Sequence, residues 1–71
     1  MKTILLKAIY KNGMRFGDHF VIGHTNNLES AKEFAKEYTN KYLNCDKADF
    51  EFGTDVSIKV FTNNTKFTIT N

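Results

Sequence analysis

The chain has 71 residues, a net charge of +2 and a single cysteine. This length accommodates one domain, and one cysteine excludes an intrachain disulfide. No apolar run approaches the ~20 residues that a membrane-spanning helix needs, so we expect a single domain over residues 1–71, in a reducing cytoplasm and without a membrane partner.

The first expected elements are two strands joined by a tight turn. Apolar residues alternate along residues 3–10, which is typical of a strand with one buried face. The alternation places Ile9 on the exposed face and four residues on the buried face: Ile4, Leu6, Ala8 and Tyr10. Asn12-Gly13 favours the positive φ angles of a type I′ turn. The second strand is expected over residues 14–23, with a bulge or widened loop at Gly17.

One amphipathic helix is expected next, from Leu28 to Leu43. Its apolar stripe has helical spacing, with Phe34 beside it, and consists of Leu28, Ala31, Ala35, Tyr38 and Tyr42. Asn26 is the expected N-cap, which puts Glu29 at the third helical position, as in a capping box. Asn44 is expected in the left-handed position after the helix.

Three further alternating segments, over residues 48–52, 56–60 and 66–70, predict three strands, the last two joined at Asn63-Asn64. The predicted fold is α+β, a single small domain with one helix packed on one face of an antiparallel sheet of four to five strands, in the order β-β-α-β-β-β. Whether the first hairpin joins the main sheet or makes a second layer stays open.

Residues suited to catalysis or metal binding are few. His19, His24 and Cys45 are the only soft metal ligands, and their spacing matches no paired-ligand motif. The four glycines are scattered singly, so there is no glycine-rich phosphate loop. We therefore expect a protein that is not an enzyme and that has no cofactor and no metal site.

A basic sheet face is the most suggestive surface feature of the sequence. Lys7, Lys11 and Ile9 are expected to point away from the helix, together with Lys59 and Phe61, and Arg15 and Lys66 add to the charge. Such a face suits protein docking, because aromatic residues serve interface cores, or single-stranded nucleic acid. A third interpretation is that the apolar residues pack across strands and the lysines only keep the sheet edge exposed to water.

The helix carries a local resemblance to a known family. Leu28, Ala31, Lys32 and Ala35 form a leucine-x-x-alanine-lysine-x-x-alanine pattern that resembles one family of small phage-encoded type I anti-CRISPR proteins, and the order and length of the elements are similar as well. In that family a basic pair near the helix start contacts the CRISPR surveillance complex. Lys32 matches the first position, Glu33 departs from the second, and Lys36 lies one turn further on.

These observations lead to a functional hypothesis. The expected function is a small non-enzymatic protein-binding module, a phage or mobile-element inhibitor that occupies the DNA-engaging site of a CRISPR effector or another host complex. The residues expected to bind the partner are Lys32, Lys36, Lys7, Lys11, Lys59 and Phe61. The alternative is a small nucleic-acid-binding domain that uses the basic sheet face, and homodimerisation stays open.

Overall fold

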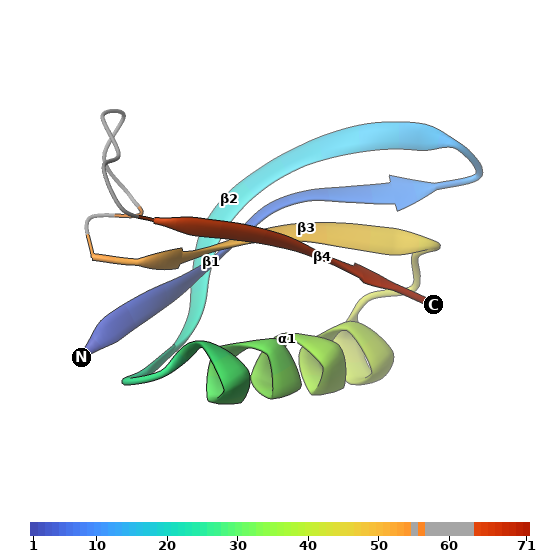
Figure 1. Cartoon of the computed structure of the whole chain (residues 1–71). Helices are drawn as coiled ribbons and strands as arrows, with labels where there is room; N and C mark the ends of the chain where they lie inside the picture. Colours follow the sequence, from blue (N-terminus) through green and yellow to red (C-terminus); the bar gives the residue numbers. More distant parts are fainter. Residues whose placement is uncertain (55, 57–63) are drawn as a thin grey trace.

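The computed structural model describes residues 1–54, 56 and 64–71. In chain order its elements are β1 (Lys2–Lys11), β2 (Met14–Thr25), α1 (Leu28–Tyr42), β3 (Lys47–Gly53) and β4 (Thr65–Thr70). The strands form one antiparallel sheet in the order β2-β1-β3-β4. Figure 1 shows α1 lying along one side of this sheet.

The predicted α+β class is confirmed, and the first hairpin joins the main sheet rather than forming a second layer. The described residues form four strands in the order β-β-α-β-β. The strand expected over residues 56–60 falls outside the described residues except for Val56, which is buried. None of the described helices is long and apolar enough to cross a membrane.

The turn between β1 and β2 has the predicted conformation. Asn12 has a φ of 54° and Gly13 a φ of 78°, and two successive positive φ angles are the signature of a type I′ turn. The Asp46 carboxylate accepts a hydrogen bond from the Asn12 backbone N–H at 2.8 Å. This contact ties the turn to the segment that enters β3.

A β-bulge at Lys7 interrupts the regular alternation of β1. Leu6 pairs with Phe50 of β3, and Ala8 pairs with the adjacent Asp49, so Lys7 has no counterpart on β3. An extra residue in a strand reverses the face to which the following side chains point. The face that a residue of β1 occupies therefore depends on which side of Lys7 it lies.

Because of the bulge, the side chains of β1 after Lys7 lie on the opposite faces from those predicted. Ile4 and Leu6 precede the bulge and pack into the core under α1, as predicted. Beyond it, the prediction is wrong: Ile9 packs against the same core, and the register places Ala8 and Tyr10 on the opposite side. We call that side, which carries Leu5, Ala8, Tyr10, Asp49 and Glu51, the far face of the sheet.

Strand β2 has two irregularities in its pairing with β1, one of them at Ile22 and the other where a bulge was expected. Gly17 is followed by Asp18 and His19, which together stand opposite Lys7 alone in the pairing of β1 and β2. His19 has a φ of 86°, a left-handed conformation that is uncommon for a residue with a side chain.

The core between α1 and the sheet is built from small helix residues and large strand residues. Ala31, Ala35 and Thr39 are the buried side chains of α1, while Phe50 and Phe52 of β3 fill the space beneath them. Small side chains let the helix approach the sheet closely. The Thr39 hydroxyl donates to the Ala35 carbonyl at 2.7 Å, which satisfies the one buried hydroxyl on this surface of α1.

Helix α1 begins at Leu28 as predicted, whereas its N-cap and its last residue each differ from the prediction by one position. Asn27, not Asn26, is the N-cap, because its side-chain oxygen accepts from the Ser30 N–H at 2.8 Å. The helix ends at Tyr42, and Leu43 continues in an extended conformation with φ −104°. Asn44 does not adopt the predicted left-handed conformation.

Candidate functional site

The flank of the molecule formed by β2 and α1 carries a row of aromatic side chains. Along α1, aromatic residues recur every four positions and therefore lie on one side of the helix. Those of β2 belong to the edge strand of the sheet. We call this set the aromatic surface, and it consists of Phe16, Phe20, Phe34, Tyr38 and Tyr42.

Ring contacts connect the two elements. The Phe20 ring of β2 meets Tyr38 edge to face with 6.4 Å between centroids, and Tyr38 meets Tyr42 at 5.1 Å. Phe34 lies directly on the backbone of β2 at Gly23, since a Cβ atom at that glycine would stand 2.8 Å from the Phe34 ring. Strand and helix thus present one continuous aromatic flank from Phe20 to Tyr42, and Phe16 lies further along β2.

Most of this flank is open to solvent. Phe16 is 46% exposed, Phe20 40%, Phe34 41% and Tyr42 69%. With ~150–250 Å² per whole aromatic side chain, these four leave roughly 300–500 Å² of aromatic surface uncovered. A contiguous patch of that size marks an interaction site more often than a scattered set of exposed apolar residues does.

The helix part of the aromatic surface is hollowed. A recess of about 180 Å³ is lined by Phe34, Tyr38 and Tyr42, with Glu37 and Lys41 beside them. An apolar floor with charged residues at its border has the arrangement of an interface core and its rim.

Sequence reasoning missed this surface because it assigned the aromatic residues of the helix to the buried stripe. In the structure the small residues Ala31, Ala35 and Thr39 make the contact with the sheet, and Tyr38 and Tyr42 fall on the flank. The sequence does contain a signal for this surface. Three large aromatic residues at a spacing of four lie next to three small residues at the same spacing, which indicates that the small residues contact the sheet and the aromatic residues form a separate stripe beside them.

The lysines predicted on the helix lie away from the aromatic surface. Lys32 and Lys36 are exposed, and each is two positions from Phe34, a spacing that puts residues on nearly opposite sides of a helix. They remain available for charged contacts, on the other flank of α1.

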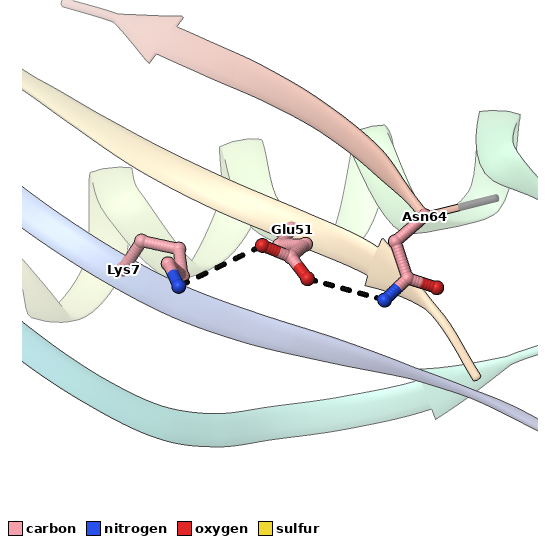
Figure 2. Close-up of polar contacts among 3 residues, drawn as sticks. All are labelled: Lys7, Glu51 and Asn64. Atoms are coloured by element: carbon pink, nitrogen blue, oxygen red, sulfur yellow. Dashed lines mark hydrogen bonds and ion pairs between the residues drawn. The ribbon is translucent and has the colours of Figure 1, made fainter. Parts of the chain in front are cut away.

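Lys7, predicted to contact a partner, belongs to a polar cluster on the far face. Its Nζ lies 3.6 Å from Oε1 of Glu51, which is fully buried. The other oxygen of Glu51 accepts from Asn64 Nδ2 at 3.2 Å. Figure 2 shows the three side chains reaching toward one another across the strands, with α1 behind the sheet.

The remaining predicted residues are separated from these. Lys11 is exposed at the end of β1, next to the turn. Lys59 and Phe61 lie outside the described residues. The structure therefore places Lys7 on the far face and Lys32 and Lys36 on α1, so these three do not form one surface.

The far face has mixed charge rather than a purely basic character. Asp49 and Glu51 occupy the central strand β3 between the cations of its neighbours. Among the described residues of this face, the aromatic ring of Tyr10 is engaged already: the hydroxyl donates to Asp49 Oδ2 at 3.0 Å, and the Lys47 ammonium stands 4.4 Å from the ring centroid.

Cys45 has the environment of a structural thiol. It is buried in the core beside Leu6 and Ala48. Burial, and then the charge of Asp46, raise the pKa of the Cys45 thiol, which disfavours the reactive thiolate. Within the described part of the chain, no three His, Cys, Asp or Glu side chains cluster closely enough to hold a metal ion.

Comparison of the chain with protein-family models, with curated proteins and with solved structures gave no match.

Proposed function

We propose that the protein is a small protein-binding module that docks its partner on the aromatic surface and acts by occupying a site on that partner. The observation that supports this is the continuity of exposed aromatic rings from Phe20 of β2 to Tyr42 of α1. Aromatic side chains are the commonest energetic anchors of protein interfaces.

The size of the surface suits such a role. A standard interface buries ~800 Å² on each partner, so roughly 300–500 Å² of exposed aromatic area supplies the apolar centre and leaves the remainder to a polar rim. Glu37 and Lys41 border the recess and provide part of that rim.

The resemblance of the helix to small anti-CRISPR proteins indicates which partner to test first. We propose a phage or mobile-element inhibitor whose target is a CRISPR surveillance complex or a related host complex. Lys32 and Lys36 lie on the other flank of α1 from the aromatic surface. A partner that covers the helix from one flank to the other contacts the aromatic rings and these lysines together.

The alternative, nucleic-acid binding on the sheet, has less support. A surface that tracks phosphates is expected to be uniformly positive and to offer free aromatic faces for stacking. The far face carries Asp49 and Glu51 on its central strand, and the ring of Tyr10 is covered by Lys47.

Affinity capture with surface variants tests the proposal. Tagged protein is incubated with nuclease-treated bacterial lysate at ~0.3 M salt, which screens exposed charges, and bound proteins are identified by mass spectrometry. Phe20→Ser and Tyr42→Ser should each lower recovery of a defined complex by about tenfold or more.

The matched control is Val21→Ser, which replaces a 43% exposed apolar residue that pairs with Leu5 of the far face. It should leave recovery unchanged. Equal loss in all three variants, or recovery that vanishes with nuclease in the wild type, would contradict docking on the aromatic surface.

A further inference from the structure

The far face contains a hollow that the proposed docking function does not use. It has a volume of about 350 Å³, and its polar lining consists of Lys7, Arg15, Asp49, Lys66 and Thr68. We call it the far-face hollow. All four strands of the sheet contribute, with Arg15 on β2, Lys7 on β1, Asp49 on β3 and Lys66 and Thr68 on β4.

Asp49 and Thr68, which line the hollow, lie in one row of the sheet with two small residues. The register aligns Gly17, Ala8, Asp49 and Thr68 across the four strands. Gly17 and Ala8 bring almost no side-chain volume to their half of the row. A Cβ at Gly17 would lie 4.0 Å from the Arg15 guanidinium, so this group reaches toward the row from β2.

Charges in the hollow are only partly compensated. Lys7 is paired with Glu51. Both oxygens of Asp49 accept hydrogen bonds from neutral hydroxyls, Oδ2 from Tyr10 at 3.0 Å and Oδ1 from Thr68 at 2.8 Å. Neither Arg15 nor Lys66 forms an ion pair with a residue in the described ranges. Two cations from opposite edges of the sheet therefore border one hollow.

We propose that the far-face hollow binds a small anionic ligand whose phosphate or carboxylate group lies between Arg15 and Lys66 and whose hydroxyl groups donate to Asp49. A guanidinium and an ammonium are the usual donors to such anions, and the Arg contact is bidentate. The Asp49 carboxylate has lone pairs beyond the two that Tyr10 and Thr68 use. A volume of about 350 Å³ lies at the lower end of the ~300–1,000 Å³ of small-molecule sites.

A small ligand suits this arrangement better than a nucleic acid. The cations converge on one hollow from separate strands instead of following a line, and Glu51 and Asp49 on the central strand repel a second phosphate. A ligand with one anionic group can contact Arg15 and Lys66 without bringing a second negative charge close to Asp49 and Glu51.

Chemical-shift perturbation tests the proposal directly. Amide spectra of the ¹⁵N-labelled protein are recorded at ~0.15 M salt while glycerol 3-phosphate, glycerate or glycerol is added. We expect saturable shifts of the Ala8, Gly17, Asp49 and Thr68 amides with the phosphate or the carboxylate, and none with glycerol. Which of the two anions binds more tightly identifies the ligand class.

Charge-removing variants make the test specific. Arg15→Gln and Lys66→Gln should each weaken binding by about tenfold, the value of one charge-assisted hydrogen bond. The control Lys2→Gln, at the start of β1 and outside the hollow, should leave ligand binding unchanged. The same spectra show that each variant is folded.

Shifts that never saturate and spread over all exposed lysines would overturn the proposal. So would a single-stranded oligonucleotide that shifts the same amides at a lower phosphate concentration than glycerol 3-phosphate does. Arg15 and Lys66 lie on the far face, opposite the aromatic surface. A wild-type protein that captures its partner but shows no saturable shifts with either anion would therefore show that this site fails while the docking function stands.

Discussion

At the scale of single residues, the bulge at Lys7 decides how the sheet is used. By reversing the faces of β1 it sends Ile9 into the core and leaves Ala8 on the far face. It also brings the Lys7 ammonium to the buried Glu51 carboxylate. A bulge leaves little trace in a sequence, because Lys7 alternates with apolar neighbours as any strand residue does.

The buried carboxylate gives the first stability prediction. Glu51→Ala should lower the free energy of unfolding by about 1–3 kcal/mol, since it removes the acceptor of the Asn64 amide and the ion pair of Glu51 with Lys7. Urea denaturation measures the change. The exposed control Glu33→Ala should stay within about 0.5 kcal/mol of the wild type, and an equally small effect of Glu51→Ala would show that the cluster contributes nothing.

The first hairpin carries two glycines with opposite expectations, Gly13 in the turn and Gly17 within β2. Gly13 has a φ of 78°, so Gly13→Ala should destabilise the protein by about 1–2 kcal/mol, the cost of a left-handed L-residue. Gly17→Ala should not destabilise, since no clash opposes its Cβ and the unfolded chain loses entropy. Thermal unfolding of both variants distinguishes these outcomes, and similar losses would contradict the turn geometry.

The Cys45 thiol gives a prediction about pH. Burial, followed by Asp46, raises its pKa above the ordinary value of 9.0, so the thiolate is scarcer in the native than in the unfolded chain. Reaction with a disulfide reagent at pH 8 should be slower than for free cysteine and should accelerate in urea. Because the pKa of the thiol is higher in the native than in the unfolded chain, the stabilisation of the native state by the protonated thiol is complete below pH 9.0. It is lost as pH rises through the native pKa. Fast native labelling would contradict this.

At the scale of elements, the sequence predicted the order of the described strands, the helix and the Asn12-Gly13 turn. These depend on local periodicity and turn chemistry, which the sequence shows directly. It did not predict the faces beyond Lys7 or the aromatic surface, because these depend on register and on how much of the sheet one helix covers. Tyr38 and Tyr42 are predicted to be buried from the helical spacing alone, and only the position of α1 on the sheet shows that they lie on the flank.

The corrected N-cap makes an element-scale prediction. Asn27→Ala should cost about 1 kcal/mol of stability because it removes the acceptor for the Ser30 N–H. Asn26→Ala is the matched control and should have little effect, since Asn26 precedes the cap. Comparing the two unfolding midpoints checks the assignment, and a larger loss for Asn26→Ala would reverse it.

At the scale of the whole molecule, two surfaces have separate chemistry. The aromatic surface on β2 and α1 is apolar with a charged border, and the far face carries a mixed-charge hollow between its strands. Strand β2 contributes to both, but its register places Arg15 on the far face and Phe16 and Phe20 on the helix side. A partner docked on the aromatic surface therefore leaves the hollow accessible.

Docking on the aromatic surface is the central claim, and site-specific photocrosslinking tests it most directly. A photoreactive phenylalanine is placed at Tyr42, or at Val21 as the control, and each protein is irradiated in nuclease-treated bacterial lysate. Both positions are exposed in the free protein, by 69% and 43% respectively. We expect one discrete adduct from position 42 and none from position 21. Adducts from position 21 alone, or the same adducts from both positions, would contradict the claim that the aromatic surface receives the partner.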